Sequence, residues 1–95
     1  MTKMKRVAEI IPLAMNFSNL LSSIPAGQTI QEGSVTIVDR QGNDVSMSMV
    51  KRMTVGTDRI DAIIQGGTKG WKYDVCFKIS TQDYDFEEHV TLTVN

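Results

Sequence analysis

The chain has one cysteine, Cys76, one histidine and two prolines among its 95 residues. A single thiol cannot form a disulfide within the chain, so a folded domain must be held together by its apolar core. Small secreted domains are often stabilised by disulfides, and the lone cysteine therefore favours assembly in a reducing cytoplasm. A single histidine also leaves few ways to build a catalytic or metal-binding cluster.

The sequence also has no strong charge bias and no long apolar run. Ten basic and eleven acidic residues give a net charge of -1, so neither a nucleic-acid partner nor a membrane partner is predicted. The apolar-leaning segment 7–17 is interrupted by Glu9, Pro12 and Asn16. It is too short to span a bilayer and lacks the cleavage pattern of a signal peptide.

Short segments in which apolar and polar residues alternate are the dominant pattern. The composition, 41% hydrophobic and 22% charged, is sufficient for the core of one domain. Alternation of this kind is typical of half-buried strands. The predicted strands cover residues 13–17, 29–39, 45–50, 60–64, 71–80 and 86–94, with a looser edge or crossover piece at 51–57. The sequence therefore predicts an all-β, immunoglobulin-like sandwich of about six to seven antiparallel strands.

The predicted domain covers residues 13–95 and follows an N-terminal arm, residues 1–12. The basic side chains of this arm, Lys3, Lys5 and Arg6, are expected to be solvated, and a helical turn over residues 4–12 is the alternative. In the segment 45–50, Val45, Met47 and Met49 are expected to face the core. Gly33 is expected to mark a bend or a bulge in its strand.

A cluster of glycines at residues 66–70 precedes Tyr73, which lies two residues before the apolar Val75. In immunoglobulin-like sandwiches a tyrosine at this place is buried and its hydroxyl bonds back to the connecting loop. The sequence therefore predicts a structural corner formed by Tyr73, Gly67 and Gly70. The glycine spacing is not that of a phosphate-binding loop.

Groups that could perform catalysis are scarce. His89 lies on a strand face beside Glu87, but no second histidine or thiol stands at metal-ligand spacing in the sequence. Cys76 is predicted to face outward, without a neighbour that would activate its thiol. We therefore expect no enzymatic activity, no cofactor and no metal site.

Most of the chain resembles a family of small structural proteins of tailed phages, described as fibre–tail adaptor or neck/tail-associated proteins. The motifs that match it are Asn16-Phe17-Ser18, Leu21, residues 26–30 (AGQTI), residues 66–75 (GGTKGWKYDV) and residues 90–94 (VTLTV). Asn16 stands where the family has an aspartate, and Trp71 stands where a small polar residue is usual. These departures concern the partner more than the fold.

The resemblance implies a non-enzymatic virion protein, an adaptor or decoration subunit assembled in the host cytoplasm. It would dock on portal, neck, tail or fibre proteins in a symmetric ring. The candidate partner contacts are Lys3, Lys5, Arg6, Leu20, Leu21, Trp71 and Tyr84. The alternative function is an immunoglobulin-like module that binds carbohydrate or a host cell surface. This function needs an exposed aromatic platform, for which Trp71, Tyr84 and Phe86 are the candidates.

Overall fold

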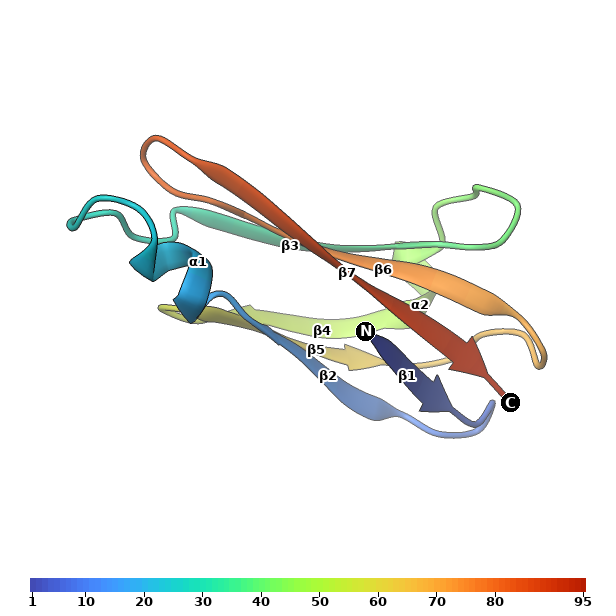
Figure 1. Ribbon diagram of the computed structural model, residues 1–95. Helices are drawn as coiled ribbons and strands as arrows, with labels where there is room; N and C mark the ends of the chain where they lie inside the picture. The colour runs from blue at the N-terminus through green and yellow to red at the C-terminus, as the bar shows by residue number, and fades with distance from the viewer.

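The computed structural model describes residues 1–95 and consists of two sheets packed face to face (Figure 1). A four-stranded sheet has the order β1-β7-β6-β3, and a three-stranded sheet has the order β2-β5-β4. The all-β sandwich predicted from the alternation is thereby confirmed. The elements are β1 Thr2–Lys5, β2 Ile11–Asn16, α1 Ser18–Ser22, β3 Glu32–Val38, α2 Ser46–Met49, β4 Val50–Val55, β5 Arg59–Ile64, β6 Lys72–Ser80 and β7 Asp85–Val94.

The strand orders β3-β6-β7 and β2-β5-β4 correspond to the C-F-G and B-E-D orders of immunoglobulin sandwiches. Four of the five strand pairs are antiparallel. The exception is β1, which pairs in parallel with β7. The predicted antiparallel pairing is confirmed among the other six strands, and β1 lies in the segment for which no strand was predicted.

The core lies between the two sheets and is built from alternate residues of the strands. In β6, for example, Tyr73, Val75, Phe77 and Ile79 are buried while the residues between them face outward or lie half-buried. The remaining buried apolar residues are Leu13, Met15, Phe17, Val35, Ile37, Met49, Ile60, Ala62, Ile64, Val90, Leu92 and Val94. The long strands give the molecule extents of 44 × 22 × 22 Å.

Residues 2–5 form a strand rather than a free arm. Lys3 and Arg6 are exposed as expected, whereas Lys5 is not. Thr2 to Lys5 pair with Thr91 to Val94 along the free edge of β7. The Asn95 N–H also donates to the Lys5 carbonyl at 2.8 Å. Lys5 is 1% exposed, because its apolar stem and its ammonium are enclosed where the two chain ends meet.

Residues 45–50 also differ from the prediction, because the short helix α2 replaces most of the expected strand. Met47 is fully exposed, whereas Met49 is buried in the core. The Asp44 carboxylate accepts the Ser46 N–H at 2.9 Å and the Ser46 hydroxyl at 2.6 Å. Local bonds of this kind favour a turn or a helix start over an extended strand. The following strand β4 occupies the segment that the alternation had left as an edge piece.

Gly33 is paired regularly with Ile79 in the β3–β6 ladder, so the expected bulge is not at this position. A Cβ atom there would lie 2.8 Å from the Val55 side chain of the other sheet. The glycine therefore permits a close approach of the two sheets. The irregularity in pairing lies instead between Val50 and Arg52 in β4.

The two ends of the long axis are closed by different segments (Figure 1). We call the end that contains the C-terminus the terminal end; it comprises residues 5–12, 39–52, 63–73 and 94–95. The opposite end, the hairpin end, comprises residues 17–31, 56–58 and 81–84, and includes α1 and the β6–β7 turn.

Candidate protein-binding site

A groove of about 400 Å³ opens on the outer face of the three-stranded sheet at the terminal end. Its apolar lining includes Ile10, which is 53% exposed, and Ile63 of the central strand β5. The full lining is Ile10, Ile11, Pro12, Lys51, Arg52 and Ile63. An exposed apolar groove bordered by charged side chains is typical of a protein-binding site.

Strand register explains why these residues meet. Pro12 and Arg52 are both cross-strand partners of Ile63, one on each side of it, so the three side chains form a row across the sheet. Ile63 faces outward because Ile64 beside it is in the core. The pairing irregularity between Val50 and Arg52 leaves both Lys51 and Arg52 exposed next to this row.

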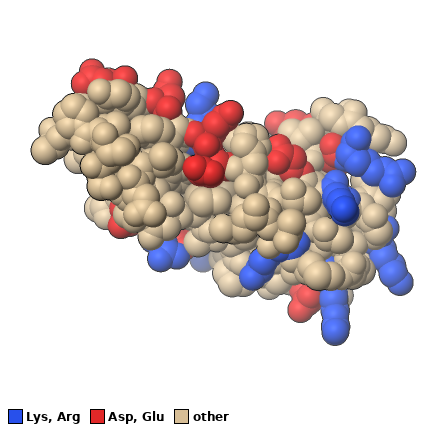
Figure 2. Space-filling model, in the orientation of Figure 1, with Lys and Arg blue, Asp and Glu red and all other residues tan.

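The terminal end is the basic end of the molecule, and Figure 2 shows Lys and Arg side chains gathered over it. Its exposed basic residues are Arg6, Arg40, Lys51, Arg52, Lys69 and Lys72. Acidic side chains dominate toward the hairpin end, where Asp83 lies in the turn and Asp85 begins β7. The two ends therefore attract partner surfaces of opposite charge.

The predicted corner residues lie at the terminal end and fix its shape. Tyr73 is 4% exposed, and its hydroxyl oxygen accepts the Thr68 N–H at 2.8 Å. Gly67 and Gly70 have φ angles of 95° and 86°. A Cβ atom at Gly67 would also lie 2.7 Å from the Val94 side chain, so this turn requires glycine for two reasons.

Lys5 cannot serve as a partner contact, which corrects the prediction from the sequence. Its ammonium donates hydrogen bonds to the carbonyls of Arg6 at 2.8 Å, Val7 at 3.1 Å and Gly66 at 2.7 Å. Burial lowers the pKa of Lys5, and the nearby Glu9 carboxylate opposes this shift. Three carbonyl acceptors match the three donors of an ammonium, so the residue acts as a clamp between β1 and the loop after β5.

The other predicted contact residues at or near this end differ in exposure. Lys3 and Arg6 are exposed. Trp71 is half-buried against the core, and the Arg40 guanidinium lies 4.6 Å from the centroid of its ring. The stacked guanidinium covers the indole face, so Trp71 is not an open aromatic platform.

Leu20, Leu21 and Tyr84 lie at the hairpin end, so the structure does not bring the predicted contact residues together. Leu20 and Leu21 are on α1 and pack half-buried against the core. Tyr84 is 40% exposed and stacks on Phe86 with a centroid separation of 6.3 Å. One exposed tyrosine remains available for contact there.

The hairpin end is held by two reciprocal pairs of side-chain hydrogen bonds. The Gln28 side chain donates to Asp83 at 2.7 Å and accepts the Asp83 N–H at 3.2 Å. The Gln82 side chain accepts the Thr29 N–H at 2.8 Å and donates to the Thr29 hydroxyl at 3.1 Å. These bonds are exposed to water.

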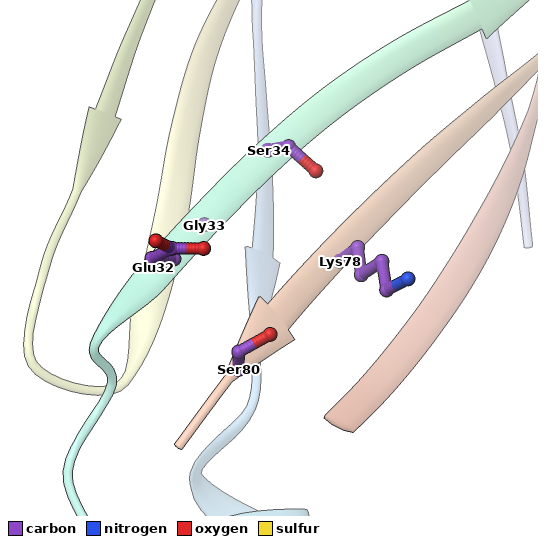
Figure 3. A pocket seen from close by; sticks show the side chains of 5 residues that line it. All are labelled: Glu32, Gly33, Ser34, Lys78 and Ser80. Carbon is purple, nitrogen blue, oxygen red and sulfur yellow. The ribbon is translucent and has the colours of Figure 1, made fainter. Parts of the chain in front are cut away.

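A second, smaller depression of about 200 Å³ lies on the outer face of the four-stranded sheet. Figure 3 shows its lining between β3 and β6, with Lys78 extending away from Glu32. Its lining residues are Glu32, Gly33, Ser34, Lys78 and Ser80. The depression has no apolar lining, which is unlike the sites that bind small molecules.

The groove was not predicted from the sequence, although the sequence pattern of β5 indicates one of its residues. Ile63 interrupts a regular alternation, since Ile60, Ala62 and Ile64 already supply the inward side of β5. An isoleucine on the outward side of a strand indicates an exposed apolar position. Its neighbours in the groove come from two other strands and could be identified only from the register.

The sandwich has a basic, partly apolar end, and surfaces of this kind are typical of protein-binding sites. The chain matches the family of the podophage GP4 fiber-tail adaptor protein gp77 over residues 5–94, and it belongs to that family. It is therefore a structural adaptor of a phage virion that binds other virion proteins. No curated protein and no solved structure matches the chain. None of its helices has the length and apolar character needed to cross a membrane.

Proposed function

We propose that the chain acts as one of several copies in a symmetric ring between phage tail and fibre, with one partner bound at each end. The observation that supports this most is the groove at the terminal end. The side chains of Pro12 and Ile63 form an apolar surface that a partner can bury. The positive charges of Lys51 and Arg52 beside it favour an acidic partner. The expected occupant is a partner segment with apolar side chains flanked by carboxylates.

The hairpin end supports a second contact of different chemistry. It is acidic, it carries the exposed Tyr84, and it lies at the far end of a molecule 44 Å long. An adaptor needs two separate surfaces, and these two differ in charge and in position. Contacts of modest size suffice, because several copies around one axis add avidity.

The β4 edge adds to the terminal contact. Every residue from Lys51 to Val55 is exposed, and β4 is the last strand of its sheet. Unpaired backbone groups on an edge strand can accept a strand from a neighbour. The charged side chains of Lys51 and Arg52 restrict which neighbours can approach.

Charge reversal tests the groove. The double variant Lys51→Glu, Arg52→Glu should fold normally and lose binding to one purified partner, tail or fibre, while binding to the other is retained. Arg59→Glu is the matched control, because Arg59 is a basic residue of the same sheet near the hairpin end. It should bind the partner of the groove as the unaltered protein does.

A second pair of variants tests the hairpin end. Tyr84→Ala combined with Asp83→Lys should lose the partner that the groove variant retains. Loss of the same partner in both variants would contradict the assignment of one partner to each end. Full incorporation of the groove variant into particles, measured by genetic complementation, would contradict the proposed role of the groove. Electron microscopy of tails would count the copies in the ring.

The carbohydrate-binding alternative has less support. Such a site needs an open aromatic platform, and the indole face of Trp71 is covered by Arg40. Tyr84 and Phe86 stack on each other at the hairpin end, with Phe86 half-buried. No adjacent groove with convergent polar groups accompanies them.

A further inference from the structure

The outer face of the four-stranded sheet holds a thiol, an imidazole and a carboxylate side by side. Cys76 on β6 is the cross-strand partner of His89 on β7, and Glu87 lies two residues before His89 on the same face. One ligand atom from each of the three residues lies within 4.8 Å of the others. The sequence alone does not show this, because Cys76 and His89 are brought together only by the register of the hairpin.

We infer that Cys76, Glu87 and His89 form a binding site for one divalent transition-metal ion of the zinc type, whose coordination is completed by water. A thiolate, an imidazole and a carboxylate are the ligands that zinc takes in proteins. Three protein ligands and one water form a common zinc arrangement. This inference does not depend on the proposed adaptor function.

The distances fit such an ion. The Cys76 Sγ atom lies 3.7 Å from a Glu87 carboxylate oxygen, and His89 Nε2 lies 3.6 Å from the other oxygen. Ligand atoms around a tetrahedral zinc ion are about 3.3–3.6 Å apart, given metal–ligand distances of about 2.0–2.3 Å. The two contacts use different oxygens of Glu87, so binding through a single carboxylate oxygen requires these half-exposed side chains to rotate.

A fourth residue orients the imidazole. The Nδ1 atom of His89 lies 2.9 Å and 3.1 Å from the two carboxylate oxygens of Asp74. A carboxylate on one ring nitrogen fixes the ring and leaves the other nitrogen, here Nε2, toward Glu87. This arrangement is the usual outer shell of a metal-bound histidine. Asp74 is therefore a positioning residue and not a ligand.

Binding would replace protons by the metal. Burial, and after it the Glu87 carboxylate, raises the pKa of Cys76. The Asp74 carboxylate raises the pKa of His89. The ion forms bonds to Sγ and Nε2, and the proton of the thiol and any proton on Nε2 pass to the solvent. No electron is transferred.

Cobalt serves as a spectroscopic probe for the site. Chelator-treated full-length protein titrated with Co²⁺ should develop a cobalt–thiolate charge-transfer band, with one ion bound per chain, and Zn²⁺ should displace the cobalt. Cys76→Ser should abolish the band, and His89→Gln should weaken binding by more than about 100-fold. Asp74→Asn should keep the band but weaken binding by about 10–100-fold, the range expected for an outer-shell partner.

Glu88→Gln is the matched control. Glu88 is the cross-strand partner of the buried Phe77, so it lies on the opposite side of β7 from Glu87 and His89. It should bind cobalt as the unaltered protein does. If Cys76→Ser does not fold, the half-exposed His89 provides the same test through His89→Gln. Three results would overturn the inference. These are the absence of a cobalt–thiolate band, equal cobalt affinity in all variants, and binding of half an ion per chain by a protein of doubled mass, which would place the ion between two copies.

Discussion

The two ends of the sandwich are closed by hydrogen bonds of different kinds. At the terminal end, the buried side chains of Lys5 and Tyr73 bond to the backbone of the loop that contains Gly66 and Thr68. At the hairpin end, the half-buried Gln28 bonds to Asp83 and the exposed Gln82 bonds to Thr29. Both ends join segments that are distant in the sequence.

The two ends differ in the free-energy cost of breaking these hydrogen bonds. Water can replace an exposed hydrogen bond at little net cost, whereas a buried group that loses its partner remains unsatisfied. We therefore expect the terminal end to be the more rigid of the two and the hairpin end to adjust more easily to a partner. The proposed groove is consequently presented on a preformed surface.

The largest effect is expected from Lys5→Met. The change keeps an apolar stem but leaves the carbonyls of Arg6, Val7 and Gly66 without their donor, and we expect a loss of about 2–4 kcal/mol in the free energy of unfolding. Denaturant unfolding measures this loss. Lys3→Met, on the exposed side of the same strand, is the control and should change stability by less than about 0.5 kcal/mol. Equal effects of the two changes would show that the clamp contributes nothing.

A pair of glycine variants compares the ends directly. Gly67 and Gly27 both have positive φ, 95° and 92°, but only Gly67 has the Val94 side chain in the place of a Cβ atom. Gly67→Ala should cost about 2–3 kcal/mol, from backbone strain and a steric clash, and Gly27→Ala about 1 kcal/mol from strain alone. Thermal unfolding of both variants tests the difference. A smaller cost at Gly67 would reverse the ranking of the two ends.

A smaller effect is expected at the tyrosines. Tyr73→Phe removes the acceptor of the Thr68 N–H in a largely buried position, and we expect a loss of about 1–2 kcal/mol. Tyr84→Phe at the hairpin end removes a hydroxyl that is free to contact water, and less than about 0.5 kcal/mol should be lost. An unchanged unfolding midpoint for Tyr73→Phe would show that the corner hydrogen bond is unimportant.

The smallest effect concerns pH and the exposed loop of the terminal end. The Asp39 carboxylate accepts the N–H groups of Gln41 and Asn43, each at 2.9 Å. The bond from Asn43 is the main reason why the pKa of Asp39 is lowered. Because the folded pKa is below the unfolded one, the contribution to stability is present above the unfolded pKa and is lost as pH falls through the folded pKa.

The corresponding variant is Asp39→Ala. Its stability deficit relative to the unaltered protein should be largest near neutral pH and should shrink as the pH falls toward about 2. Unfolding curves over that pH range measure the deficit. A deficit that does not change with pH would mean that the loop does not depend on the charge of Asp39.

Sequence reasoning located the sandwich because β2, β5, β6 and β7 show regular alternation, which is a local signal. It failed for β1 because a lysine in a charged segment is normally expected to be exposed to solvent. The burial of Lys5 depends on a carbonyl at Gly66, far away in the chain. It also failed for residues 45–50, where alternation suggested a strand but bonds from Ser46 to Asp44 favour a helix start.

The candidate sites were harder to predict than the fold, because both depend on strand register. Pro12, Arg52 and Ile63 form a row only after three strands are aligned. Cys76 and His89 become neighbours only when the β6–β7 hairpin has its observed register. The sequence contains these residue types but gives no distances between them.

The parallel pairing of β1 with β7 has a consequence for how the chain acquires its structure. Thr2 and Thr91 are partners although they are about 90 residues apart. On the ribosome, β1 must therefore wait until nearly all of the chain has been synthesised. Contacts of such high sequence separation form late, since the entropy of closing a long loop must be overcome first. Once β7 has formed and until β1 docks on it, the edge of β7 is open and can pair with a strand from another molecule.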